Sequence, residues 1–121
     1  MQAELLDIRN HMVQHPPFDE MAEDLLDQVV QSIEVVYFRA GSTILELGNS
    51  NHWLHYVRSG AAEIYRRSGE LYNRIGEGEI FGQFGLLRNK KVRFPVQALE
   101  DCLVYRIPDE IFQLLWENDE N

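Results

Sequence analysis

The sequence predicts a mostly β fold, a sandwich or barrel with helices at both ends, and three observations support this prediction. Apolar residues recur at helical spacing through about residue 33, and short segments rich in β-branched and aromatic residues follow, separated by glycine-bearing turns. After Pro108 the helical spacing returns. A chain of 121 residues is long enough for one core. We therefore expect a single domain over 1–121, with helices at about 3–33, a barrel at about 34–107 and a terminal helix at about 109–117.

The N-terminal region predicts two helices separated by a proline break. Leu5, Ile8 and Met12 lie at helical spacing, and the Pro16-Pro17 pair interrupts the pattern. Asp19 is the candidate start signal of the second helix. The apolar stripe of that helix comprises Met21, Leu25, Leu26, Val29, Val30 and Ile33. Both helices therefore have an apolar face that must pack against another part of the protein.

The barrel region predicts seven strands between turn signals. They are Glu34–Phe38, Thr43–Glu46, Trp53–Arg58, Ala61–Arg66, Leu71–Ile75, Phe94–Leu99 and Leu103–Ile107. The third and fourth are joined across Ser59-Gly60, which predicts a tight hairpin. Two segments interrupt the strand pattern: Gln83–Leu87 predicts a short helical turn, and Asp109–Glu117 predicts a helix with acids at its start. The apolar face of that last helix would pack on the barrel or on a second copy of the chain.

Charge and hydropathy exclude two classes of partner. The net charge is −9, with 20 acids against 11 bases, so binding of a nucleic-acid backbone is disfavoured. No apolar run approaches the roughly 20 residues of a membrane helix, and the N-terminus lacks the features of a secretory signal. We therefore expect a cytoplasmic protein without nucleic-acid or membrane partners. The bases gather in one short segment, at Arg88, Lys90, Lys91 and Arg93.

No pattern in the sequence predicts catalysis. Cys102 lies in an apolar segment, which favours a buried structural thiol over a nucleophile. His52 and His55 are three residues apart, so they would face opposite sides of a strand, and no histidine follows them. Some metal enzymes are built on β-barrels of this kind, and their metal ligands include two inward-facing histidines two residues apart on one strand. We therefore predict no catalytic residues, no metal site and no enzymatic activity.

Two motifs in sequence order resemble those of cyclic-nucleotide-binding domains. The first is Phe38-Arg-Ala-Gly41-Ser-Thr-Ile44, then Gly48, Leu54-His-Tyr56 and Ser59-Gly60; the second is Gly76-Glu-Gly78-Glu-Ile-Phe81-Gly82, then Gln83-Phe84-Gly85-Leu86-Leu87. The resemblance covers roughly residues 17 to 117. It implies an antiparallel eight-stranded jelly roll, a double-stranded β-helix, with flanking helices. It also implies a small nucleotide ligand, cyclic AMP or another adenine nucleotide, and no cofactor.

The second motif resembles the family's phosphate-binding cassette, in which a glycine and the backbone N–H groups of a short helix approach the cyclic phosphate. The ligand-binding residues that this resemblance implies are Gly82, Gln83, Phe84, Gly85, Leu86, Arg93 and Phe94. The cassette departs from the family pattern twice. Gln83 stands where the family has a glutamate, and Val92 stands where it has an arginine. Arg93 comes one residue later, and in a regular strand that shift would turn its side chain away from the pocket.

Two functions remain open at this point. The first is a regulatory domain that senses a cyclic or related nucleotide through this altered cassette and relays the signal to other domains. The second is a non-binding interaction or dimerisation module whose nucleotide site has decayed. The segments 92–96 and 98–108 are similar to those of bacterial proteins that also carry a CBS-domain pair and a nucleotidyltransferase-like module. That similarity implies the N-terminal part of a longer protein, with other domains of the same chain, or a second copy, as partners.

Overall fold

The computed structural model describes residues 2–88 and 90–119, and these form eight strands and four α-helices. The strands are β1 (Glu34–Phe38), β2 (Thr43–Leu45), β3 (Trp53–Ser59), β4 (Ala62–Tyr65), β5 (Leu71–Ile75), β6 (Ile80–Phe81), β7 (Val96–Ala98) and β8 (Cys102–Pro108). The helices are α1 (Ala3–Met12), α2 (Glu23–Ser32), α3 (Gln83–Leu86) and α4 (Asp109–Asp119), with a 3₁₀ turn at Phe18–Glu20.

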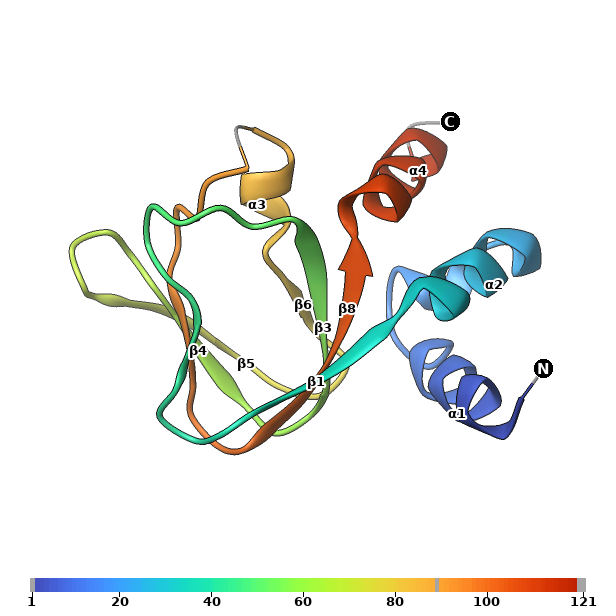
Figure 1. The fold of residues 1–121 in the computed structure, drawn as a ribbon, viewed down its shortest axis with the longest axis horizontal. Coiled ribbons are helices and arrows are strands. Elements are labelled where there is room, and N and C mark those ends of the chain that lie inside the picture. Colours follow the sequence, from blue (N-terminus) through green and yellow to red (C-terminus); the bar gives the residue numbers. More distant parts are fainter. Residues whose placement is uncertain (1, 89, 120–121) are drawn as a thin grey trace.

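The strands form two four-stranded sheets whose neighbours all pair antiparallel. The strand orders are β1-β8-β3-β6 and β2-β7-β4-β5. The helices α1, α2 and α4 lie together at one end of the barrel, whereas α3 lies on the barrel itself (Figure 1). The predicted fold class, an antiparallel jelly roll with flanking helices, is confirmed.

The strand β3 separates the two main parts of the hydrophobic core. Successive side chains of a strand point to opposite faces. Leu54 and Tyr56 therefore belong to the cluster beneath the helices, together with Ile107 of the neighbouring β8. Val57 faces the barrel interior and packs with Phe81 of β6. Both faces of β3 are buried from Leu54 to Val57, so its sequence lacks the regular alternation of apolar and polar residues of a half-exposed strand.

The helices α1 and α2 pack on the outer face of this sheet, as their apolar stripes predict. Met12, Phe18 and Val29 are almost completely buried in the shared cluster. The expected start of α2 at Asp19 is wrong, because Asp19 lies in the 3₁₀ turn and the helix begins at Glu23. No helix in the described part of the chain is both long enough and apolar enough to span a membrane.

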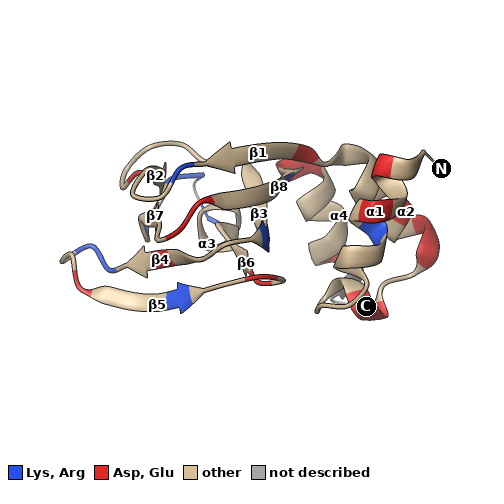
Figure 2. Cartoon of the chain, turned by 90° about the horizontal axis from the view of Figure 1, so that it is seen from below, with Lys and Arg blue, Asp and Glu red and all other residues tan. Residues whose placement is uncertain are grey.

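Acidic residues are concentrated at the helical end of the molecule. The first 33 residues contain one base, Arg9, and seven acids, and the remaining bases lie on or beside the barrel (Figure 2). Like-charge repulsion therefore disfavours an anionic ligand at the helical end and leaves the barrel as the more favourable surface for one.

The barrel differs from the predicted strands at two places near α3. The strand β6, only two residues long, was not predicted, because two residues are too few to show an alternating pattern. The predicted strand Phe94–Leu99 is shorter than expected and begins at Val96. Pro95 has no N–H to donate to a neighbouring strand, and residues 93 and 94 form a bend before it. These two irregular segments face each other across the cavity described next.

Candidate functional site

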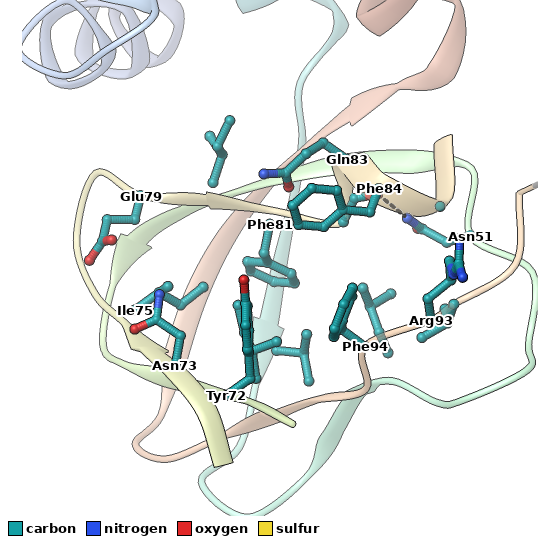
Figure 3. A pocket seen from close by; sticks show the side chains of 17 residues that line it. Asn51, Tyr72, Asn73, Ile75, Glu79, Phe81, Gln83, Phe84, Arg93 and Phe94 are labelled. Carbon is teal, nitrogen blue, oxygen red and sulfur yellow. Dashed lines mark hydrogen bonds between the residues drawn. The ribbon is translucent and has the colours of Figure 1, made fainter. Parts of the chain in front are cut away.

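A cavity of about 220 Å³ opens on the barrel between β5, β6, α3 and the bend before β7. Figure 3 shows side chains from all four segments converging on it. Its lining residues are Leu45, Asn51, Ile64, Tyr72, Asn73, Ile75, Glu79, Ile80, Phe81, Gly82, Gln83, Phe84, Gly85, Val92, Arg93, Phe94 and Val96. Most of these lining residues are apolar and a few polar side chains stand among them, which is the usual composition of a small-molecule site.

Gly82 begins the cassette in a conformation that other residues adopt only at a cost. Its φ is 93°, and a Cβ on this residue would lie 3.1 Å from Nδ2 of Asn51 and 3.0 Å from Cδ2 of His55. The buried Asn51 amide donates to the carbonyl oxygens of Trp53 (2.9 Å) and Gly82 (3.2 Å). The turn into α3 is therefore fixed both by its backbone and by a side chain from the loop before β3. Sequence reasoning missed Asn51 because no local pattern marks it.

Gly85 allows the chain that follows α3 to cross close over the helix. A Cβ at this position would lie 2.8 Å from the carbonyl oxygen of Lys91. The N–H of Lys90 donates to the Gly85 carbonyl over 2.8 Å. The cassette helix and the loop carrying the basic residues consequently form one compact unit at the mouth of the cavity.

Six of the seven predicted ligand-binding residues line the cavity, and Leu86 does not. The six are Gly82, Gln83, Phe84, Gly85, Arg93 and Phe94. Leu86 is 2% exposed and packs in the cluster beneath the helices. In a helix with 3.6 residues per turn, residues two apart point to nearly opposite sides. The exposed Phe84 therefore borders the cavity while Leu86 points into the helical core.

Arg93 borders the cavity although it is one residue late relative to the family pattern. The expectation that it turns away assumed a regular strand, but residues 93 and 94 form a bend, so alternation of faces does not apply. Val92, at the position of the family's arginine, is 6% exposed and packs in the barrel core. Two backbone hydrogen bonds hold it there, from Val92 N–H to Asn49 O (2.9 Å) and from Gly48 N–H to Val92 O (3.1 Å). The side chain of Arg93 remains exposed at the cavity edge.

Three aromatic rings form a row across the cavity wall. The rings of Tyr72 and Phe94 are stacked with centroids 5.2 Å apart, and those of Phe94 and Phe84 are tilted with centroids 5.6 Å apart. Phe94 thus contacts both of the other rings, and Figure 3 shows all three rings at the cavity. Such spacings are typical of favourable aromatic pairs. Tyr72 was not predicted, because its place beside Phe94 depends on β5 and β7 both pairing with β4.

The polar groups of the cavity include one unpaired acceptor. The buried Oε1 of Gln83 has no hydrogen-bond partner among the described residues. A buried acceptor without a partner is costly, so a ligand that donates a hydrogen bond there would be favoured. The charged lining residues are Arg93 and Glu79, and the carboxylate of Glu79 already accepts from Gly76 N–H (3.0 Å). Among the described residues, the cavity thus offers the Arg93 cation and the unpaired Gln83 acceptor to a ligand.

His55 lies beside the cassette but does not form part of a metal site. Its ring stacks on Phe81 with centroids 4.7 Å apart, and burial lowers the pKa of His55 to about 3. His52 is exposed. Among the described residues, no group of three or more His, Cys, Asp or Glu side chains is arranged to hold a metal ion. His55 is therefore a neutral, buried packing residue.

A second cavity, of about 480 Å³, lies between α2, α3 and α4. Its lining residues are Pro17, Glu20, Met21, Ala22, Leu25, Leu54, Ile80, Gln83, Leu87, Phe112, Leu115 and Trp116. Ile80 and Gln83 line both cavities. The two cavities are thus separated only by the β6–α3 junction, and α4 borders the second of them.

The fold, the glycine-dependent turn and the cavity beside it define a jelly-roll domain with a candidate ligand site. The family model described as "Cyclic nucleotide-binding domain" matches residues 35–119, so this chain belongs to the cyclic nucleotide-binding domain family. Domains of this family bind ligands and regulate; catalysis belongs to other parts of some of the proteins that contain them.

Individual relatives resemble the chain at low sequence identity. A cAMP-dependent protein kinase regulatory subunit of Yarrowia lipolytica is 26% identical over 96 residues, which is 79% of this chain and 25% of that protein. The cGMP-dependent protein kinase egl-4 of Caenorhabditis elegans is 23% identical over 108 residues, covering 89% of this chain and 14% of that protein. The chain spans a quarter or less of the length of these two relatives.

Solved structures share the fold. The cAMP-bound fragment PfPKA-R (141-441) superimposes with a TM-score of 0.80 at 21% identity, covering 94% of this chain and 42% of that one. The sensor domain of the transcriptional regulator DNR from Pseudomonas aeruginosa gives a TM-score of 0.80 at 17% identity, covering 91% and 80% of the two chains. At these identities the likeness concerns the fold alone.

Proposed function

We propose that this chain is a regulatory domain that binds a cyclic nucleotide in the first cavity and relays its occupancy through α4. The observation that carries the proposal is that Gly82 and Gly85 of the cassette border the same cavity as Arg93 and Phe94. Two short segments, eight positions apart in sequence, thus supply backbone, a cation and an aromatic ring to one cavity, as recognition of a phosphate and a planar base requires.

Each of three side chains has a chemical role in this proposal. Arg93 is a cation whose fork of N–H donors suits a phosphate, and its exposed position lets it reach over the cavity mouth. The Gln83 Oε1 accepts a hydrogen bond from a ligand hydroxyl. Phe94, with its neighbours in the aromatic row, provides a face for a planar ring.

We infer that the cassette is altered rather than standard for its family. Gln83 accepts a hydrogen bond without the negative charge of a glutamate, which makes that bond weaker. At the buried position of Val92 the charge of the family's arginine is missing. The charge of the exposed Arg93 is screened by water, so it attracts a phosphate less strongly. We therefore expect affinity for a cyclic nucleotide to be weaker than for a site with both charges buried.

Cyclic AMP is the ligand that we propose first, and another adenine nucleotide second. Relatives whose names specify cAMP include the Yarrowia lipolytica regulatory subunit, and the PfPKA-R structure contains bound cAMP. We further propose that the domain acts in the cytoplasm as a part of a longer bacterial protein, in which a CBS-domain pair and a nucleotidyltransferase-like module would receive the signal. A second copy of the chain is the other partner that α4 could contact.

Isothermal titration of the purified chain with cAMP, cGMP, AMP and ATP tests this function. We expect saturable binding of cAMP and about tenfold weaker binding by Arg93→Ala, because a hydrogen bond to a charged group is lost. Arg88→Ala removes the same charge from a position outside the cavity lining and should leave the affinity unchanged. Absence of binding at millimolar nucleotide would exclude this function.

The cavity volume and the aromatic row favour a second candidate function, a non-binding interaction module. At about 220 Å³ the cavity is smaller than the roughly 300–1,000 Å³ of most ligand pockets, and Phe94 stands within it. In that case the domain would serve assembly through α4. The same titration separates the two functions, because the interaction module predicts no heat with any nucleotide.

A further inference from the structure

Lys90, in the loop between α3 and β7, has an unusual backbone conformation. Among the described residues it is the one non-glycine residue with a positive φ, at 63°. Side chains disfavour this left-handed region, and such outliers persist where surrounding contacts hold them. Here the N–H of Lys90 donates to Gly85 O (2.8 Å), and its carbonyl accepts from Asn51 N–H (2.8 Å). The backbone of Lys90 is therefore fixed to two residues of the cavity wall.

The side chain of Lys90 joins the cassette to the C-terminal helix. Its Nζ lies 2.6 Å from Oδ2 of Asp109 and donates to the carbonyl oxygen of Leu86 over 3.2 Å. Asp109 is the first residue of α4, and its Oδ1 accepts from Gln113 Nε2 over 3.0 Å. Burial raises the pKa of the Asp109 carboxyl, but hydrogen bonds from Lys90 and Gln113 outweigh it and leave that pKa below its usual value. The carboxylate is thus held in its charged, paired form.

Neither local geometry nor stability accounts for a lysine at this position. Glycine or asparagine would adopt this φ at lower cost, but neither could reach Asp109. The ion pair is partly exposed, with side-chain exposures of 36% for Lys90 and 24% for Asp109, and pairs of that kind contribute little to stability. What the lysine does provide is a direct polar contact between the last turn of α3 and the first turn of α4.

We propose that the Lys90–Asp109 ion pair transmits the occupancy of the first cavity to α4, which makes Lys90 a positioning residue for the C-terminal helix. This inference rests on the proposed function. A ligand that displaces α3 must also displace the Gly85 and Leu86 carbonyls, which accept hydrogen bonds from the backbone N–H and from the side-chain Nζ of Lys90, respectively. Leu86 of α3 belongs to the same buried apolar cluster as Phe112 and Leu115 of α4, so packing also links the two helices. The ion pair adds a direct polar contact from the end of α3 to the first residue of α4, so a shift of α3 must move or break it.

The first arm of the test needs no ligand. Hydrogen exchange of the α4 amides is measured in the full chain for wild type, Lys90→Met, Asp109→Asn and the double variant. Methionine keeps the length of the lysine stem, and asparagine keeps the Gln113 contact. We expect each single variant to exchange about two- to fivefold faster, as loss of a partly exposed ion pair allows, and the double variant to be no faster than either.

The matched control in this arm is Arg88→Met, which removes a cation from the same loop at an exposed position without an ion pair to α4 among the described residues. It should leave the exchange of α4 unchanged. If Lys90→Met also leaves α4 unchanged, or if the two single effects simply add in the double variant, the ion pair does not hold the helix and the inference is wrong.

The second arm measures transmission with cAMP as the probe. The chain has two tryptophans, Trp116 on α4 and Trp53 on β3, so NMR gives one indole signal for the helix and one for the barrel. We expect cAMP to shift the Trp116 signal in wild type, and the shift at saturation to fall by at least half in Lys90→Met. Arg88→Met should retain the whole shift.

The outcomes of this arm distinguish the two proposals. Binding of cAMP with an undiminished Trp116 shift in Lys90→Met would overturn the coupling and leave the proposed function intact. Binding by wild type with no Trp116 shift would likewise overturn the coupling alone. No binding of cAMP by wild type would overturn the proposed function, and the coupling with it.

Discussion

The two faces of the sheet that contains β3 are filled in different ways. On the outer face, Tyr56 is completely buried, stacks on Tyr105 and meets the ring of Phe18 edge-on. On the inner face, His55 stacks on Phe81, and beyond that ring lies the first cavity. The same strand thus supports a closed core on one side and a hollow on the other. Stability should therefore depend mainly on the outer face, and ligand binding on the inner one.

Polar groups reinforce the contrast. The Tyr56 hydroxyl lies 2.8 Å from Nδ1 of His11 and 2.9 Å from Nδ1 of His15, and the Nε2 of His11 lies 2.7 Å from Glu77. Burial raises the pKa of Tyr56 far above its usual range, so it stays neutral. On the inner face the Gln83 oxygen has no partner. Hydrogen-bonding capacity is thus used beneath the helices and left available beside the cavity.

The largest expected effect tests this division directly by removing one phenyl ring from each region. Phe18→Ala should destabilise the protein by about 3–5 kcal/mol, because the ring is 1% exposed and leaves a void. Phe94→Ala should cost about 1 kcal/mol, since it loses two ring contacts in a site that is already partly open. Urea unfolding of both variants measures the difference. Equal losses would mean that the aromatic row is part of the structural core.

Lowering the pH should destabilise the protein through His55 on the inner face of the sheet. Its Nε2 lies 3.3 Å from Oδ1 of Asn51, an acceptor, so Nε2 carries the proton and Nδ1 is the unpartnered atom. Protonation would place a charge in this buried site, which is why burial lowers the pKa to about 3. Between about pH 3 and 6.5 the unfolded chain binds the extra proton and the folded chain does not. The free energy of unfolding should therefore fall as pH falls, by about 1.4 kcal/mol per unit below about pH 6.

Urea midpoints between pH 7 and 5 measure this slope. Carboxyl groups add little in that interval, since their usual pKa values lie below it. His55→Gln can still donate to Asn51 and should remove most of the slope. His52→Gln changes an exposed histidine and should keep it. A slope that survives in His55→Gln would assign the acid sensitivity to groups other than His55.

Two glycines with almost the same backbone separate the cost of conformation from the cost of contact. Gly82 and Gly41 have φ values of 93° and 86°, but a Cβ on Gly41 would have no neighbour within 4 Å. Gly41→Ala should therefore cost about 1 kcal/mol from the backbone alone. Gly82→Ala should cost about 2 kcal/mol, because the methyl group also presses on Asn51 and His55. Thermal unfolding gives both values. Equal losses of stability in the two variants would show that the Asn51 and His55 side chains move away from the new methyl group without cost.

Much of this arrangement could be predicted from the sequence where the signal is local. The strands β1 and β5 have the predicted bounds, and Cys102 is buried as expected. The segment that resembles the family's cassette also lies beside the cavity. These features depend on periodicity and turn residues within a few positions.

The features that were missed depend on contacts between distant segments. Asn51 holds Gly82 across a separation of 31 residues, and nothing in its own neighbourhood marks that role. Leu86 was assigned to the site, although one helical turn directs it into the other core. The reach of Arg93 depends on the bend before Pro95, which a prediction based on strand alternation could not include.

The smallest expected change in stability has the opposite sign to the others and concerns Gln83. Replacing an unpartnered buried acceptor by an apolar group of similar shape removes a desolvation cost, so Gln83→Leu should be neutral or stabilise the free protein by up to about 1 kcal/mol. If the oxygen serves a ligand, the same variant should bind cAMP several-fold more weakly. Asn51→Leu is the contrasting variant, since its amide already donates to two carbonyls and its loss should destabilise by about 1–3 kcal/mol. Urea unfolding with and without cAMP measures both effects. Destabilisation by Gln83→Leu would show that the glutamine has a structural partner, and the contrast between the filled and the hollow face would then not extend to this residue.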